Sequence, residues 1–178
     1  RGSDSDETVY KLELLLNQSG ISAESRAVVT PALERAEQTG LPAAAIQLPD
    51  GRIVTGKTSE LLGASSAALL NALKALGGIQ KDIHLISPII IEPLQKLKTT
   101  HLGSVNPRLH TDEILIALSI CAATNPTAEL ALRQLPKLRG CEAHSTVLLS
   151  QVDENIFRRL GVNLTSEPQY QTNKLYHK

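Results

Sequence analysis

The sequence predicts an α/β fold, a three-layer αβα sandwich in which helices cover both faces of a mixed β-sheet. Stretches of alternating apolar residues, typical of strands, are interleaved with stretches of helical period. Glycines and prolines stand where one kind of stretch gives way to the other. With 178 residues, 42% of them hydrophobic, the chain is long enough for one domain with a proper core. We expect an α/β domain over residues 41–178, preceded by a short helical segment over 1–40.

The helical segment opens with a predicted helix over residues 4–19. Asp4 and Glu7 have capping-box spacing, apolar residues recur at helical period, and Gly20 supplies the stop. An opening that is helical and polar is typical of a chain that continues from a part of the protein upstream. We therefore expect a missing N-terminal part.

A second helical stretch is predicted over residues 22–38, closing at Gly40. Thr30 and Pro31 are placed as an internal N-cap and a first-turn proline, so two short helices are an alternative. From residue 43 the period changes to that of strands, and a β-hairpin follows. Its turn is Pro49-Asp50-Gly51, and residues 52–55 are rich in β-branched side chains.

The middle of the chain combines small-residue and apolar stretches. Residues 65–76 are predicted to form a helix that is capped by Ser65 or Ser66 and ended by Gly77-Gly78. Residues 83–86 are a candidate buried strand. Ser87-Pro88 can open a further helix, although Pro93 leaves its true start open, and a polar loop is expected over 99–110.

The last third of the chain is rich in predicted helices. Thr111 is expected to cap an almost wholly apolar helix, EILIALSICAA, which should be buried on all sides. Asn125-Pro126 opens another helix that runs towards Leu135. A core strand is predicted over 144–149. The remaining elements are a helix capped by Ser150 and Asp153 that ends at Gly161, and a short strand over 162–165.

Composition excludes several classes of function. Eighteen basic residues balance eighteen acidic ones, and aromatic residues make up only 2%, so a nucleic-acid role is not expected. No apolar run approaches the roughly 20 residues of a membrane span. The two cysteines, Cys121 and Cys141, lie on different predicted elements, which favours free thiols and a cytoplasmic location.

Two long runs carry a resemblance to a known family. Residues 105–178, from VNPRLHTDEIL to NKLYHK, and residues 35–74, from RAEQTGLPAAA to LLNALK, resemble the C-terminus of the bacterial domain-of-unknown-function family 1846, also called uncharacterised protein family 0371. Members of that family are about three times as long as this chain and have no agreed activity. The resemblance implies that the domain's own N-terminal partner is absent here.

A second resemblance concerns the fold. A strand, an Asp-Gly turn, a strand ending in Thr-Gly and a small-residue helix, as found between Ile46 and Leu76, resemble the beginning of cytidine-deaminase-like domains. That resemblance implies zinc ligands on the following helix and after a later strand. This chain has Ser65-Ser66-Ala67-Ala68 at the first place and Pro88-Ile89-Ile90-Ile91-Glu92 at the second. We expect a deaminase-like scaffold without its zinc, and no other metal or cofactor.

Residues 51–58, GRIVTGKT, match the phosphate-loop pattern letter for letter. A phosphate loop needs a strand before its first glycine and flexible backbone between its glycines, whereas Arg52 to Thr55 are mostly stiff strand formers. The hairpin is therefore the favoured interpretation, and Lys57 is not expected to bind a nucleotide.

Three residues are candidates for catalysis. Cys141 and His144, three residues apart, can act as nucleophile and base or as two metal ligands, and His110 is an alternative base. If residues from Ala143 onward form a strand, alternation sends neighbouring side chains to opposite faces, which favours a structural role for Cys141 and His144.

Polar side chains gather at the predicted ends of elements, where α/β sheets bind ligands. Two arginines and the free amides after Asn125 suit an anion. The ligand-binding candidates are Asn106, Arg108, Asn125, Thr127, Arg139, Glu142 and Ser145.

These observations favour a C-terminal ligand-binding or assembly domain of a larger cytoplasmic protein, with a small anionic ligand. The alternative is an enzyme domain that acts on a small anionic or nucleotide-like substrate. The apolar helices also lead us to expect a homo-oligomer.

Overall fold

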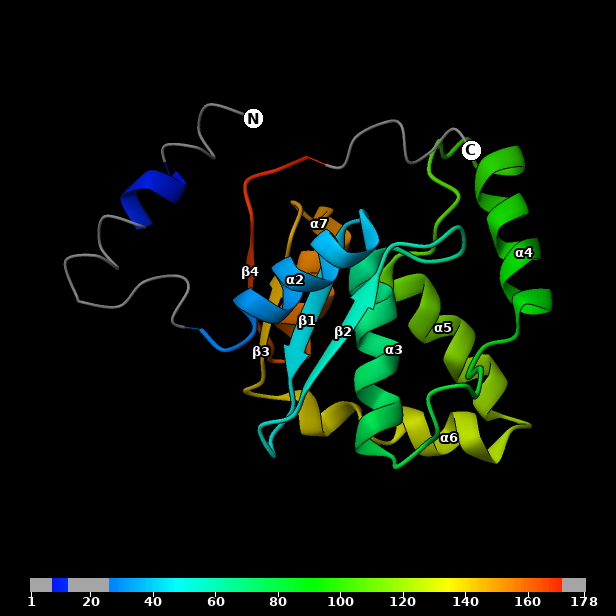
Figure 1. The fold of residues 1–178 in the computed structure, drawn as a ribbon. Coiled ribbons are helices and arrows are strands. Elements are labelled where there is room, and N and C mark those ends of the chain that lie inside the picture. The colour runs from blue at the N-terminus through cyan, green and yellow to red at the C-terminus, as the bar shows by residue number, and fades with distance from the viewer. Residues whose placement is uncertain (1–7, 13–25, 171–178) are drawn as a thin grey trace.

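The computed structural model describes residues 8–12 and 26–170 (Figure 1). Residues 8–12 are helical, and the rest of the helix predicted over 4–19 lies outside the described residues. Residues 22–25 of the second predicted helix also lie outside them.

Four strands form one mixed, open sheet in the order β2-β1-β3-β4. β1 (Ala43–Gln47) and β2 (Ile53–Lys57) are antiparallel, as are β1 and β3 (Glu142–Ser145). β4 (Asn163–Ser166) runs parallel to β3. The α/β class and the mixed sheet predicted from the sequence are confirmed.

Helices cover both faces of the sheet (Figure 1). α2 (Val29–Thr39) packs on one face, where Val28, Ala32 and Ala45 form a small apolar cluster. α3 (Ala64–Leu76) and α7 (Gln151–Arg159) pack on the other face. α5 (Thr111–Ala122) and α6 (Pro126–Leu132) lie beyond α3.

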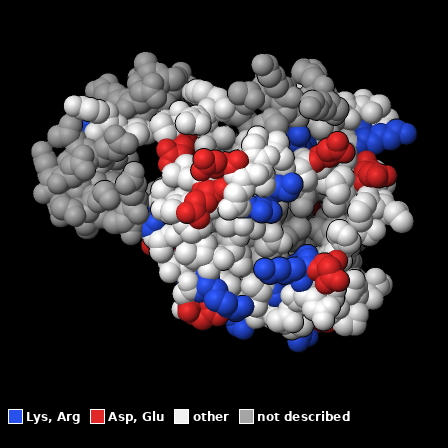
Figure 2. Space-filling view, in the orientation of Figure 1, with Lys and Arg blue, Asp and Glu red and all other residues white. Residues whose placement is uncertain are grey.

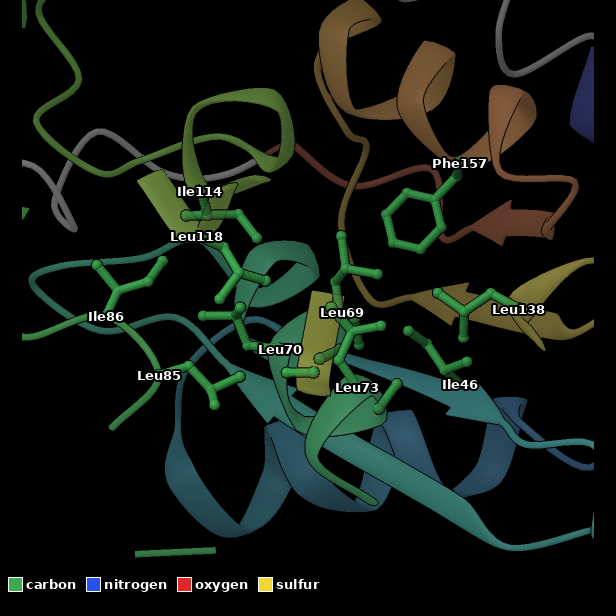
Figure 3. Packing of buried hydrophobic residues seen from close by; sticks show 14 of the residues in the cluster. Ile46, Leu69, Leu70, Leu73, Leu85, Ile86, Ile114, Leu118, Leu138 and Phe157 are labelled. Atoms are coloured by element: carbon green, nitrogen blue, oxygen red, sulfur yellow. The ribbon is translucent and has the colours of Figure 1, made fainter. Parts of the chain in front are cut away.

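The main core lies between the sheet and the helices of the α3 face. Ile46 points into it from β1, and Phe157 from α7 packs at one end (Figure 3). Leu69 and Leu73 of α3 occupy its centre and are fully buried. Alternation along β1 explains this division, because Ala44 and Ile46 face α3 whereas Ala45 faces α2.

The hairpin interpretation of residues 51–58 is confirmed. Gly51, with φ of 89°, makes the turn between β1 and β2, and Gly56 lies within β2. Lys57 is exposed at the end of β2. This backbone cannot form the inward-facing cradle of a phosphate loop.

Three predicted helix caps are wrong. α2 begins at Val29 after the non-capping Val28, so Thr30 lies in its first turn. α3 begins one residue earlier than predicted, with Gly63 at its N-cap and no side-chain cap. His110, not Thr111, is the N-cap of α5. The Ser66 hydroxyl donates to the Leu109 carbonyl instead of capping α3. The Thr111 hydroxyl donates to Asp153 instead of capping α5.

The segment between α3 and α5 also differs from prediction. Residues 83–86 form no strand; Leu85 and Ile86 are buried, but neither pairs with a strand of the described sheet. The start of α4 (Pro88–Lys96), which the sequence left open, lies at Ser87-Pro88, with the Ser87 hydroxyl as its cap, and Pro93 lies within the helix. A π-helix, Leu97–His101, follows directly, so the polar loop is shorter than expected.

The remaining differences lie in the last third of the chain. β3 covers Glu142–Ser145, whereas the prediction was 144–149, because only these four residues find partners on β1 and β4. α6 ends at Leu132 and is followed by a 3-10 helix, Leu135–Leu138. α5 is not buried on all sides: Ile116 and Ile120 are 62% and 67% exposed.

Acidic and basic side chains are interspersed on the visible face of the molecule (Figure 2). Among the described residues, none of the helices combines the length and the apolar character that crossing a membrane requires.

Candidate functional site

The carboxyl ends of three strands meet at one edge of the sheet. Lys57, the last residue of β2, pairs with Ala43 of β1. The next residue of β1, Ala44, pairs with Ser145, the last residue of β3. Ser145 in turn lies beside Ser166, the last residue of β4. Ligands of α/β proteins bind preferentially at this edge.

The chain segments that leave these strand ends enclose a pocket of about 320 Å³. β2 leads to the start of α3, β3 leads to the start of α7, and β4 leads to Tyr170. A fourth wall comes from the loop before α5. The lining residues are Gly63, Ala64, Ser65, Asn106, Arg108, Leu109, His110, Val147, Leu148, Leu149, Ser150, Asp153 and Tyr170.

Three helices begin at this pocket. Gly63, His110 and Ser150 are the N-caps of α3, α5 and α7, and all three residues line it. A helix N-terminus carries about half a positive charge and amide groups that have no partner inside the helix. Since Gly63 supplies no side-chain cap, nothing on Gly63 competes with a ligand for the first amides of α3.

Arg108 brings a positive charge to the lining and is only 8% exposed. Its Nε donates a hydrogen bond to the Ser59 carbonyl, and its main-chain nitrogen donates to Asn106 Oδ1 over 3.0 Å. Lys98 of the π-helix donates from Nζ to the Arg108 carbonyl, 2.6 Å away, and to Glu113 Oε1, 2.8 Å away. These contacts fix the loop that carries the arginine.

His110 and Asp153 form a hydrogen-bonded pair in the wall of the pocket. His110 Nδ1 lies 3.2 Å from Asp153 Oδ2. The other carboxylate oxygen, Oδ1, accepts from the main-chain nitrogen of Thr111 at 2.9 Å and from its hydroxyl at 2.7 Å. The aspartate therefore holds the imidazole by one nitrogen and leaves Nε2 on the opposite edge of the ring.

The pair shifts the titration of both members. The hydrogen bond to Asp153 raises the pKa of His110, although burial opposes the shift. Burial alone would raise the pKa of Asp153, but hydrogen bonds from His110 and Thr111 outweigh it, and the pKa is lowered. Both shifts favour the ion pair.

Ser150 lies beside this pair, yet the three residues do not form a Ser-His-Asp triad. The Ser150 hydroxyl is 3.4 Å from His110 Nδ1 and 3.1 Å from Asp153 Oδ2. In a triad, the serine and the aspartate contact different nitrogens of the ring. Ser150 also accepts the Asp153 amide as the cap of α7, at 3.2 Å.

A second polar cluster lies on the α2 face of the sheet. His144, 4% exposed, contacts Thr165 Oγ1 through Nδ1 at 2.8 Å and Glu167 Oε1 through Nε2 at 3.0 Å. Arg26 joins this cluster through Glu142 and Thr165 and donates to the carbonyls of Ala143 and Asn163. Burial lowers the pKa of His144, against the opposing effect of Glu167. Both ring nitrogens are occupied, so this histidine is part of the packing.

Of the ten candidate residues from the sequence, the pocket gathers Asn106, Arg108 and His110. The thiol of Cys141 belongs to the main core and lies 3.6 Å from the Lys137 carbonyl, on the opposite side of the sheet from His144. Asn125 caps α6, next to Thr127. Arg139 and Glu142 lie outside the pocket, and the Ser145 hydroxyl donates to the Val147 carbonyl.

Sequence reasoning missed four polar residues of the pocket as site residues: Ser65, Ser150, Asp153 and Tyr170. Ser150 and Asp153 were identified only as caps of α7. No local pattern links Asp153 to His110, 43 residues away. Within residues 8–12 and 26–170, no group of three or more histidine, cysteine, aspartate or glutamate side chains is placed to hold a metal ion.

The fold and pocket define an α/β domain with a cavity at the carboxyl ends of its strands that is lined by both apolar and polar residues. Residues 24–176 match the family model "Domain of unknown function DUF1846, C-terminal", and the chain belongs to that family.

Longer relatives carry this domain as well. The chain is 55% identical over 179 residues to a UPF0371 protein of Corynebacterium glutamicum, covering 100% of this chain and 36% of the relative. It is 57% identical to a UPF0371 protein of Corynebacterium diphtheriae and 54% identical to one of Streptococcus pyogenes, covering 99% and 97% of this chain and 35% of each relative. The chain thus spans about a third of the length of these relatives.

Proposed function

We propose that this chain is the ligand-binding domain of a longer cytoplasmic protein, and that its pocket binds a small anionic ligand. The observation that carries the proposal is the convergence of three helix starts on one cavity whose lining includes Arg108. Helix amides and an arginine are groups that proteins use for phosphate and carboxylate recognition.

The walls suggest that the ligand also has an apolar part. Leu109, Val147 and Leu149 line the cavity together with the polar residues Asn106 and Ser150. Mostly apolar walls with a few placed polar groups are typical of small-molecule sites. A cavity of about 320 Å³ accommodates a small metabolite.

The proposal is tested by calorimetric titration of the chain with sulfate, inorganic phosphate and acetate at constant ionic strength. We expect binding that Arg108→Gln weakens about tenfold or more, since a charge-assisted hydrogen bond contributes roughly 1.5–3 kcal/mol. Arg139→Gln is the matched control, because Arg139 is exposed and outside the pocket. If no anion binds to the wild-type chain, the proposal is wrong.

Assembly is a second candidate function, favoured by the outer face of α5. Ile116 and Ile120 are exposed, and no charged residue occurs from Ile114 to Ala128. We propose that a second copy of the chain covers this face. Light scattering should detect a dimer that Ile116→Lys with Ile120→Lys abolishes, while Leu102→Lys on another exposed apolar side chain does not. A wild-type chain that is monomeric at high concentration contradicts this candidate.

An enzymatic role and a deaminase-like scaffold remain alternatives within the proposal. The hairpin of β1 and β2 followed by α3 supports the scaffold, since this is the order with which such domains begin. The His110-Asp153 pair supports acid-base chemistry, because an imidazole held by a carboxylate is a common general base. Screening the chain against phosphorylated metabolites for turnover separates an enzyme from a binding domain.

A further inference from the structure

We infer that the pocket takes up its anion together with one proton, which resides on His110, and that the ligand carries a doubly charged oxyanion group such as a phosphate ester. This inference rests on the proposed function, which supplies the anion. Beyond that function, the inference specifies that the ligand is doubly charged and that His110 is the residue that takes up the proton.

The geometry around His110 fixes where the proton goes. Asp153 faces Nδ1, and its carboxylate is held in place by two hydrogen bonds from Thr111. Nδ1 therefore carries a hydrogen in the neutral ring, and the second proton must bind at Nε2. The described residues offer Nε2 no hydrogen-bond partner, and His110 lines the cavity. A protonated ring thus has one N–H for Asp153 and one for a ligand.

The charged groups around His110 come from four parts of the chain. Glu113 of α5 accepts the His110 amide at 2.9 Å and is paired with Lys98 of the π-helix at 2.8 Å, so these two charges compensate each other. Asp153 of α7 and Arg108 of the preceding loop remain, and their charges also cancel. The proton on His110 therefore decides whether the side chains of the pocket have a net positive charge.

The N-termini of the helices also contribute to the charge that the pocket presents to a ligand. The first amides of α5 and α7 already bond to Asp153 and to Ser150, whereas the start of α3 has no side-chain cap and adds about half a positive charge. The protonated pocket therefore offers about one and a half charges and the unprotonated pocket about half a charge. A dianion matches the first state better than the second. A group with one negative charge gains less from the proton, which is why the arrangement favours a phosphate ester over a monocarboxylate.

The test is the pH dependence of sulfate binding to the 178-residue chain, measured by calorimetry between pH 5.5 and 8.5 at constant ionic strength. Sulfate keeps its double charge over this range, so any slope reports the protein. We expect the affinity to fall with rising pH, approaching tenfold per pH unit above the pKa of His110, because one proton is taken up with the anion. His110→Gln should bind weakly without a slope. His101→Gln, an exposed histidine outside the pocket, should keep the slope.

A measurement on the wild-type chain covers the case in which His110→Gln does not fold. The NMR titration of the His110 ring should show a higher pKa with saturating sulfate than without it, since linkage is reciprocal. Acetate should produce a smaller rise. Sulfate binding that is independent of pH, or an unchanged His110 titration, overturns this inference and leaves the anion pocket standing. An absence of sulfate binding at every pH overturns the proposed function itself.

Discussion

A Cβ atom on Gly56 would lie 2.1 Å from the main-chain nitrogen of Ala68. β2 and α3 approach each other so closely at this point that only a hydrogen fits between their backbones. No rotamer change can relieve such a contact, because the backbone fixes the position of a Cβ and its partner is a main-chain atom.

We therefore predict that Gly56→Ala lowers the free energy of unfolding by about 3 kcal/mol, the upper part of the range for overpacking. Gly63→Ala is the control, since a Cβ there meets nothing within 4 Å, and it should cost less than about 1 kcal/mol. Urea denaturation measures both. A Gly56→Ala chain as stable as the wild type would show that β2 and α3 can separate freely.

His110 should stabilise the folded state at acidic pH. Because Asp153 raises its pKa, its contribution is fully present below the unfolded pKa of about 6.5 and is lost as the pH rises through its folded pKa. Replacing His110 by Gln should remove this term, so that the variant gains less stability than the wild type on acidification from pH 8 to 6. Equal pH profiles of unfolding free energy would contradict the pairing with Asp153.

His144 should have the opposite effect on the pH dependence of stability, because it should destabilise the fold when the pH falls. Burial lowers its pKa, so its contribution is present above the unfolded pKa and is lost as the pH falls towards the folded pKa. His144→Gln should make stability less sensitive to acid between pH 7 and 5, whatever its cost at neutral pH. The measurement is the slope of unfolding free energy against pH, with His84→Gln, an exposed histidine, as the control. An unchanged slope would argue against the neutral, buried ring.

Cys141 should react slowly with alkylating reagents. Burial and the neighbouring Glu142 raise the pKa of its thiol, and the side chain is packed into the main core. We expect neither Cys141 nor Cys121 to be modified by iodoacetamide at pH 7.5 in the native chain, and both to be modified in urea, as mass spectrometry would show. Fast, selective modification of native Cys141 would instead favour the enzyme alternative.

The purified chain should contain no stoichiometric zinc. A catalytic zinc site needs three protein ligands, and Cys141 and His144 face opposite sides of the sheet. Elemental analysis should find no zinc, and a chelator should leave the melting temperature unchanged. If about one zinc per chain is found, and it is lost on Cys141→Ala or His144→Ala, the prediction is wrong and a zinc-dependent enzyme is favoured instead.

Local chemistry explains which elements could be predicted from the sequence. Pro49-Asp50-Gly51 fixes the hairpin turn by itself, and Asn125 and Ser150 cap their helices through hydrogen bonds that span two or three residues. These features need no partner from elsewhere in the chain. The hairpin, α4, α6 and α7 were therefore located close to their observed bounds.

Long-range packing explains what could not be predicted. Leu85 and Ile86 are buried without a strand partner, and Ile116 and Ile120 remain exposed although their sequence is that of a core helix. The pocket is the strongest case, because its walls come from four segments that only the sheet brings together. Arg108 and His110 could be identified by residue type, whereas Asp153 acquires its role only through its contact with His110.

The position of Arg26 determines how the chain can be attached to something else. This arginine holds the incoming backbone against the α2 face of β3 and β4, while the pocket opens at the carboxyl ends of the same strands. Arg26 contacts Glu142 and Asn163 at the starts of these strands, so a fluorophore attached at the exposed Ala27 would lie at the end of the sheet away from the cavity. The chain can therefore be labelled at this position as a sensor without placing the label in the pocket.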